Sequence, residues 1–232
     1  RTCSDMLYLC GWEDPDAVFC AFNEDGKWKT TLFVQPKDVL KEIWEGRRPG
    51  VEGAVANWPV DSALSHEQLD DRLSSMLVEC SRVFVKMGVD SDVDVLVEKE
   101  MKSNSRERQK FGMGPVSIVD PSAMINELRL RKSDAEIKLM RHSAKIAAQA
   151  HIQAMANTKP GVGEWQLEGI IEGLFKYCKT SGIAYPCIIG SGENATILHY
   201  TVNDDTCDDG EVILIDAGCE YKGYASDITR SW

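Results

Sequence analysis

The sequence has a deficit of positive charge and no long apolar run. Lysine and arginine number 26 against 37 aspartates and glutamates, which leaves a formal net charge of −11. This balance argues against nucleic acid or an anionic membrane surface as the main partner. No window comes near the run of about 18 apolar residues that spans a bilayer, and no signal-peptide pattern opens the sequence. We therefore expect neither a nucleic-acid-binding protein nor a membrane protein.

Paired cysteine motifs and common nucleotide or nucleophile motifs are also missing. None of the eight cysteines belongs to a Cys-x-x-Cys pair, and most have apolar neighbours. We interpret them as free buried thiols in a reducing compartment, and we expect a cytoplasmic protein. The absence of a Walker loop, a Rossmann fingerprint and a nucleophile elbow argues against the enzyme classes that depend on them.

The bulk composition is that of a globular protein. The chain has 232 residues, 43% hydrophobic and 27% charged, which suits one large domain or two small ones. It begins with Arg1 rather than methionine and ends at Trp232, inside an apparent strand. We therefore expect it to be a piece of a longer protein, cut at both ends.

The first half alternates between strand and helix patterns. Residues 16–22 and 30–35 are short apolar runs around a turn-rich segment, which predicts a hairpin. A helix is predicted over residues 36–46, with an apolar face that ends at a glycine, and a second helix follows a Ser65 cap. A further strand and helix follow, so we predict a small α/β domain over residues 1–120. The apolar face of the first helix consists of Val39, Leu40, Ile43 and Trp44.

The second half begins with helices and continues with strands. Ser133 and Glu136 form a capping-box pattern at the start of a long helix, and a second helix ends near Gly182. The segments "CIIG", "ATILHY", "EVILIDAG" and "YASDITRSW" then predict strands. This order predicts an α+β domain over residues 121–232. The apolar stripe predicted for the long helix is Ile137, Met140, Ala144, Ala147, Ala148 and Ile152.

Two acids, Asp216 and Asp227, flank a predicted hairpin turn near the end of the chain. A turn at Tyr221-Lys222 places them directly opposite, about 5 Å apart at Cβ. A turn at Lys222-Gly223 makes them diagonal neighbours on the same face. Two carboxylates this close repel unless they share a proton or bind one or two divalent cations. The alternative is that both acids point into solvent.

The histidines carry less information. His199 is expected at the end of an apolar strand, where a histidine is more often structural than functional. His142 and His151 lie nine residues apart on one predicted helix, which is not a ligand spacing. We interpret both as structural or surface residues.

Taken together, these segments resemble the Xaa-Pro aminopeptidase (aminopeptidase P) family. The C-terminal motifs are Gly-Ser-Gly-x-Asn, Leu-His-Tyr, Asp-Ala-Gly and Ser-Asp-Ile-Thr-Arg, all in the family's order. Upstream, "CSDMLYLCGWEDPDAVFCAF" and "EIWEGRRPG" are similar to the family's N-terminal domain. The resemblance covers nearly the whole chain.

The resemblance implies an α/β N-terminal domain followed by the first half of an α+β "pita-bread" domain. It implies release of the N-terminal residue from peptides with proline second, by a hydroxide that bridges two divalent metals, usually Mn²⁺. Asp216 and Asp227 match two metal ligands, and His199 matches a histidine that contacts substrate beside the metals. The chain stops before the family's ligand His, both ligand Glu and a proton-shuttling His, so we expect this fragment alone to be inactive. We expect proline-containing peptides as substrates and a homo-oligomer in the full-length protein.

Two other interpretations remain open. A prolidase or creatinase-type pita-bread hydrolase shares the strand motifs, although the N-terminal segments favour aminopeptidase P. A non-catalytic pita-bread protein that binds peptides or histones is the other, and the presence of Asp216, Asp227 and His199 argues against it.

Overall fold

The computed structural model describes residues 3–232, apart from the side chains of residues 104–108. The chain divides into two compact units, Arg1–Leu130 and Arg131–Trp232, and each is described by itself. The domain boundary that the sequence predicts near Asp120 stays a prediction. In the structure, the helix over Ser122–Leu130 groups with the first unit.

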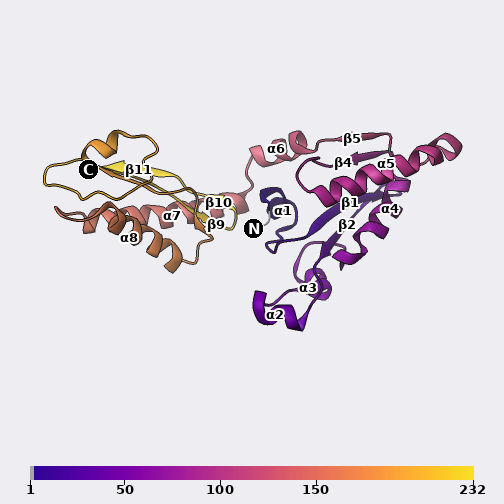
Figure 1. The fold of residues 1–232 in the computed structure, drawn as a ribbon, viewed down its shortest axis with the longest axis horizontal. Coiled ribbons are helices and arrows are strands. Elements are labelled where there is room, and N and C mark those ends of the chain that lie inside the picture. The colour runs from indigo at the N-terminus through magenta and orange to yellow at the C-terminus, as the bar shows by residue number, and fades with distance from the viewer. Residues whose placement is uncertain (1–2) are drawn as a thin grey trace. The chain divides into compact units, whose positions relative to one another are not determined.

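The first unit alternates strands and helices, as predicted (Figure 1). A three-stranded sheet has the order β1-β2-β3, in which β1 and β2 are antiparallel and β3 is parallel to β2. Strands β4 and β5 form a separate parallel pair. The elements are α1 (Ser4–Cys10), β1 (Val18–Glu24), β2 (Lys27–Val34), α2 (Val39–Glu45), α3 (Gly50–Asn57), β3 (Ser62–Ser65), η1 (His66–Gln68), α4 (Leu69–Glu79), β4 (Arg82–Phe84), α5 (Ser91–Phe111), β5 (Ser117–Val119) and α6 (Ser122–Leu130).

The β1–β2 hairpin is confirmed, and its turn explains its register. Glu24 pairs with Lys27, and both turn residues, Asp25 and Gly26, have positive φ values of 51° and 80°. Such turns match the twist of antiparallel strands. Strand β2 carries the buried residues Leu32 and Val34, which pack with α1, α3 and β3 in one apolar core.

Helix α2 forms where the sequence predicts it, but none of its residues is buried. Asp38 caps its start by accepting hydrogen bonds from the backbone of Leu40 and Lys41 at 2.9 and 3.2 Å. The backbone N–H of Gly46 closes its last turn. The apolar face that the sequence predicts for this helix is exposed to solvent. The exposed fractions of its side chains run from 70% for Ile43 to 88% for Trp44.

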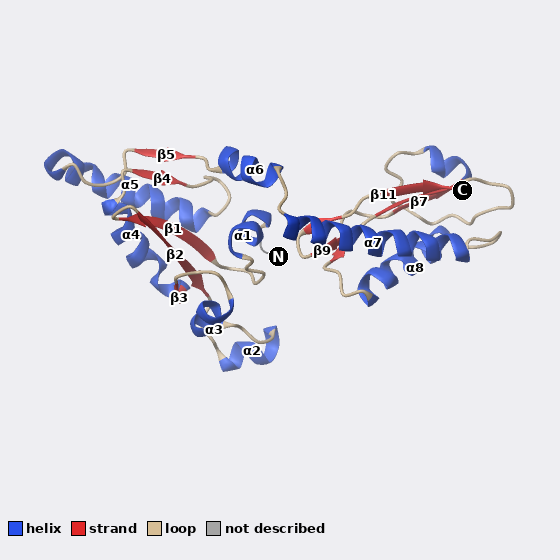
Figure 2. Ribbon diagram, turned by 180° about the vertical axis from the view of Figure 1, so that it is seen from behind, coloured by secondary structure: helices blue, strands red, loops and turns tan. Residues whose placement is uncertain are grey.

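The second unit packs two helices against antiparallel strands (Figure 2). The strands form two small sheets, with the orders β11-β8-β7 and β10-β9-β6. Only Gly218 separates β8 from β9, so the strands β8 to β11 form one interrupted hairpin. Helices α7 and α8 lie side by side along one face of these strands. The elements are α7 (Asp134–Asn157), α8 (Glu164–Tyr177), β6 (Gly182–Ile183), β7 (Ile188–Ser191), η2 (Gly192–Thr196), β8 (Ile213–Ala217), β9 (Cys219–Tyr221), β10 (Tyr224–Ala225) and β11 (Ile228–Ser231).

The long helix α7 begins at the predicted capping box, but of its predicted apolar stripe only Ala147 belongs to the buried face. Glu136 accepts from the backbone of Ser133 at 2.7 Å, and the Ser133 hydroxyl accepts from the backbone of Glu136 at 3.4 Å. The buried face consists of Ser143, Ile146, Ala147, Ala150, His151 and Ala154. Its polar members find backbone acceptors: the Ser143 hydroxyl donates to the Cys219 carbonyl at 2.9 Å, and the His151 ring contacts the Ala147 carbonyl at 2.9 Å.

The predicted strand "ATILHY" is also wrong. Residues Gly192–Thr196 form a 3₁₀ helix, and residues 197–200 lie in a turn. One cause is Gly190, which has no side chain: a Cβ there would lie 2.7 Å from the backbone carbon of Asn194, which folds back over it. His199 therefore stands in a turn and not at a strand end.

The eight cysteines are unpaired, as predicted. Cys10, Cys187, Cys207 and Cys219 are buried, three are half-buried, and Cys3 is exposed. Within the described residues, no helix combines the length and the apolar character that crossing a bilayer requires.

Candidate metal centre

The structure adopts the second of the two hairpin registers that the sequence allows. Tyr221 pairs with Tyr224, so the turn residues are Lys222 and Gly223, with φ values of 49° and 85°. Beyond the interruption at Gly218 the same register continues, with Asp216 opposite Thr229. Asp216 and Asp227 are therefore diagonal neighbours. Asp216 is half-buried, whereas Asp227 is exposed.

Both acids contact one phenol hydroxyl, that of Tyr185. The Tyr185 Oη atom lies 2.5 Å from Asp216 Oδ1 and 3.0 Å from Asp227 Oδ1. A phenol has a single proton to donate, so it satisfies one carboxylate at a time. Both carboxylates therefore converge on the same hydroxyl oxygen. The structure thus brings together the two acids that the sequence singled out.

A bulge in the neighbouring strand directs Tyr185 toward the acids. Ile183 pairs with Cys219, and Ile188 pairs with Asp216, so the four residues 184–187 lie opposite only the two residues 217 and 218. Extra residues in one strand bend it and redirect a side chain, and such bulges are common beside functional sites. The sequence analysis missed Tyr185; an aromatic residue just before Pro186, next to a predicted strand, was the only local signal.

Gly218 allows the close approach of the two hairpin strands at this point. A Cβ on Gly218 would lie 1.8 Å from the carbonyl oxygen of Ser226 and 3.2 Å from the ring of Tyr185. No real Cβ tolerates the first distance. The Asp-Ala-Gly motif therefore contains both the carboxylate of Asp216 and the glycine that lets Asp227 and Tyr185 approach that carboxylate.

Among the described residues, the two acids have no basic counterion. In the part of the chain that the structure describes, no lysine, arginine or histidine lies within ion-pair distance of Asp216 or Asp227. Burial raises the pKa of Tyr185, and the hydrogen bonds to both acids raise it further, so the phenol stays protonated at neutral pH. Two converging carboxylates without a basic partner fit a divalent cation, which prefers oxygen ligands.

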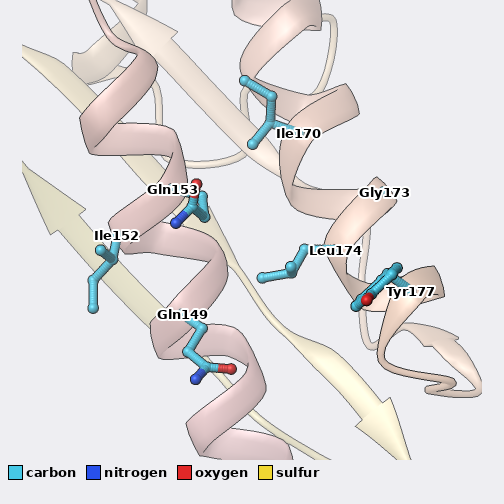
Figure 3. Close-up of a pocket in the computed structure, with 7 residues that line it drawn as sticks. All are labelled: Gln149, Ile152, Gln153, Ile170, Gly173, Leu174 and Tyr177. Carbon is cyan, nitrogen blue, oxygen red and sulfur yellow. The ribbon is translucent and has the colours of Figure 1, made fainter.

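The acids lie on the sheet face that the helices leave uncovered. Along β8, Ile213, Ile215 and Ala217 are buried in the core with α7 and α8, so the alternating side chain of Asp216 points away from the helices. Figure 3 shows the other side, where a groove of about 590 Å³ runs between the two helices. Its walls include Ile152, Ile170 and Leu174. This groove is therefore separate from the pair of acids.

His199 is not hydrogen-bonded to the acids in the part of the chain that the structure describes. It is exposed in the turn after η2, and within the described residues it makes no hydrogen bond or ion pair with Asp216 or Asp227. His142 is exposed and stacks on the ring of Tyr221 at 4.5 Å. His151 is buried, with 2% of its surface exposed, which agrees with the structural role expected for it.

A second group of possible ligands lies between α8 and β7. One carboxylate oxygen each of Glu168 and Glu172 and the sulfur of Cys187 lie within 4.8 Å of one another. Burial, followed by the charges of Glu172, Glu168 and Asp216, raises the pKa of Cys187 to about 12. A thiol binds metal as a thiolate, so this protonated thiol makes the group a poorer cation site than the two aspartates.

Comparisons with known proteins agree with the motifs. Residues 1–84 match the sequence profile of the aminopeptidase P N-terminal domain, and residues 138–232 match that of metallopeptidase family M24. The Xaa-Pro aminopeptidase of Escherichia coli (strain K12) is 37% identical over 233 residues, which cover 100% of this chain and 53% of that protein. The chain thus spans about half the length of such relatives.

Solved structures show the same fold. A proline aminopeptidase P II from Yersinia pestis superposes with a TM-score of 0.91 at 37% identity, over 100% of this chain and 53% of that one. A zinc-substituted E. coli aminopeptidase P in complex with product superposes with a TM-score of 0.92 at the same identity and coverage. These comparisons confirm the predicted fold class. Over its whole length the chain is thus similar to Xaa-Pro aminopeptidases, with a segment that matches their N-terminal domain followed by a segment that matches metallopeptidase family M24.

Proposed function

We propose that the protein to which this chain belongs is a metal-dependent aminopeptidase that releases the N-terminal residue from peptides with proline in second position. The observation that carries the proposal is the convergence of Asp216 and Asp227 on one hydroxyl, with no basic partner among the described residues. The aminopeptidase P domain at residues 1–84 favours this activity over that of a prolidase or a creatinase.

Asp216 and Asp227 would be metal ligands in this enzyme. The cations they would hold, for which we propose a pair of Mn²⁺ ions, would supply hydroxide at neutral pH by lowering the pKa of a bound water. Two carboxylates alone bind such ions weakly, because divalent cations in proteins need more ligands than two side chains provide. We therefore propose that residues 1–232 alone are inactive and that further ligands come from the rest of the protein.

Tyr185 and His199 would complete the contribution of this chain. The Tyr185 hydroxyl holds the two acids on one face of the hairpin. His199, in its exposed turn, would donate a hydrogen bond to the carbonyl oxygen of the peptide bond under attack. Proline has a fixed φ and no N–H, so a peptide bond before proline suits a dedicated site better than an ordinary peptidase cleft.

The experiment is Asp227→Asn in the protein with its complete catalytic domain. We expect this variant to lose its bound Mn²⁺, measured by elemental analysis after dialysis. It should also lose cleavage of Arg-Pro-Pro. The reason is that the amide has one neutral oxygen where the ion needs a charged ligand. Asp209→Asn, at an exposed position in the same unit, is the matched control and should change neither.

Retained metal and activity in the Asp227→Asn protein would contradict the assignment. The dipeptide Ala-Pro separates the two enzyme classes, because a prolidase cleaves it and an aminopeptidase P prefers the longer peptide. A protein that binds peptide and cleaves neither substrate would support the non-catalytic alternative.

A further inference from the structure

Glu164 is a charged residue in the interior of the second unit. It is the first residue of α8, and none of its surface is exposed. Burying an isolated carboxylate is costly, so such a group is found inside a protein only where hydrogen bonds satisfy it. The partners of Glu164 therefore show what the buried charge holds in place.

Those partners all belong to one segment, residues 191–205, between β7 and β8. The Oε1 atom accepts from the backbone and hydroxyl of Ser191 at 2.7 and 2.9 Å and from the Asn194 side chain at 3.4 Å. The Oε2 atom accepts from the Tyr200 hydroxyl at 2.8 Å and from the backbone of Asp205 at 3.0 Å. Burial alone would raise the pKa of Glu164, but these hydrogen bonds outweigh it and lower the pKa, so the carboxylate stays ionised.

The contacts fix the segment at its beginning, middle and end. Ser191 ends β7, Tyr200 directly follows His199, and Asp205 lies near the return to β8. The backbone N–H of Glu164 also donates to the Asp205 carbonyl at 2.9 Å, and the Asn194 side chain donates to the Tyr200 hydroxyl at 3.1 Å. Most of the segment has no strand pairing, so this carboxylate replaces a β-ladder as its support.

His199 depends on this support because it has little of its own. Its side chain is exposed and makes no hydrogen bond, ion pair or ring contact with the described residues, whereas Tyr200, the next residue, is buried with 9% of its surface exposed. We propose that Glu164 is a positioning residue: through Tyr200 and Asn194 it sets the location of His199 for the peptide-bond hydrolysis. This inference rests on the proposed function. Glu164 itself is enclosed and already accepts five hydrogen bonds, so it does not touch substrate.

The test is a double-mutant cycle in the protein with its complete catalytic domain. We expect Glu164→Gln to lower kcat roughly 10- to 100-fold, the scale of a misplaced catalytic group, while bound Mn²⁺ stays at the wild-type level. In a His199→Ala background the same change should cause no further loss, because the residue it positions is gone. Glu193→Gln, an exposed glutamate of the same segment outside the network, is the matched control and should leave kcat unchanged.

An equal loss from Glu164→Gln in both backgrounds would overturn the proposal and show a general structural role. Tyr200→Phe removes only the bonded hydroxyl and should reproduce the loss and its dependence on His199; a wild-type kcat for this variant would also overturn it. These two variants keep the test decisive if one of them folds poorly.

A second readout does not depend on activity. In the complete protein labelled with ¹⁵N-histidine, the imidazole NMR signals of His199 and His142 are assigned by their disappearance in the His199→Ala and His142→Ala variants. Glu164→Gln should shift or broaden the His199 signal and leave His142 unchanged, even if the wild-type protein cleaves no Xaa-Pro peptide. An unchanged His199 signal overturns the positioning role, whereas absent cleavage with a shifted signal contradicts the proposed function alone.

Discussion

Replacing Gly218 with alanine is expected to separate the two strands that bring Asp216 and Asp227 together. The new methyl group would stand 1.8 Å from the Ser226 carbonyl oxygen, far inside any contact that a real Cβ makes. Ser226 is itself held in place, because its backbone N–H and its hydroxyl both donate to the Cys219 carbonyl, at 2.9 and 3.1 Å. The backbone itself has to move.

The magnitude follows from what this movement breaks. Overpacking a fixed site typically costs 1–3 kcal/mol, and a clash between backbone atoms belongs at the upper end, about 3 kcal/mol. For a unit of about 100 residues this lowers Tm by roughly 12–24 °C. Thermal unfolding followed by circular dichroism measures the change, with Gly173→Ala as the matched control. Gly173 lies within α8 and nothing stands within 4 Å of its Cβ position, so alanine there should be neutral or slightly stabilising.

Two results would refute this reasoning. If the Gly218→Ala protein melts within a few degrees of wild type, the strands do not approach as closely as the structure indicates. If it is destabilised but the complete enzyme still binds Mn²⁺ normally, the contact at Gly218 does not control the spacing of the acids.

Two further predictions concern single hydrogen-bonded groups. Without metal, Tyr185→Phe should lower the free energy of unfolding by about 1 kcal/mol, because the acids lose their shared hydrogen-bond donor at a half-exposed site. In the complete enzyme, Mn²⁺ should narrow the difference in Tm between the variant and the wild type. Equal Tm values of the two metal-free proteins would contradict this prediction. Hydrogen bonds from the Ser133 backbone, the Tyr224 hydroxyl and the Ser133 hydroxyl lower the pKa of Glu136 from 4.5 to about 2. Its stabilising effect is therefore fully present above pH 4.5 and is lost as the pH falls toward 2. Glu136→Gln should accordingly lower Tm at pH 6 but not at pH 2, and a difference independent of pH would exclude this linkage.

Much of the geometry of the candidate metal centre follows from local sequence. In a two-residue hairpin the turn sets the partner of every strand residue, so the spacing of Asp216 and Asp227 around Lys222-Gly223 predicted their proximity. The sequence left two registers open, because Tyr221-Lys222 and Lys222-Gly223 are both plausible turns. The structure distinguishes them, and Lys222 adopts the left-handed φ of 49°.

The buried face of α7 was not predictable from hydrophobicity. The helix is rich in alanine, so more than one stripe of the surface looks apolar, and the larger side chains Ile137 and Ile152 favoured the wrong one. The face that packs on the sheet includes Ser143 and His151, whose hydroxyl and ring Nδ1 atoms contact backbone carbonyls. Small residues on this face let the helix pack closely against the sheet. A scale of residue hydrophobicity does not take residue size into account.

The segment around His199 escaped prediction for a different reason. Its apolar run "ATILHY" has the composition of a strand, yet Asn194 and Tyr200 bond to Glu164, which lies 30 and 36 positions earlier in the sequence. Contacts of such range leave no mark in a local pattern. Tyr185 was missed likewise, because its position depends on a bulge relative to strands more than 30 residues away.

The exposed helix α2 has a consequence for the dynamics of the first unit. A helix of seven residues is only marginally stable in water unless its neighbours bury one face, and here they bury no residue of it. Its integrity thus depends on the Asp38 cap and on the turn closed at Gly46. Such a segment opens at little free-energy cost without disturbing the core, so its amide hydrogens should exchange with solvent far faster than those of β2, whose last residues are buried. The part of this unit that presents the most exposed tryptophan is thereby also a part that unfolds locally with ease.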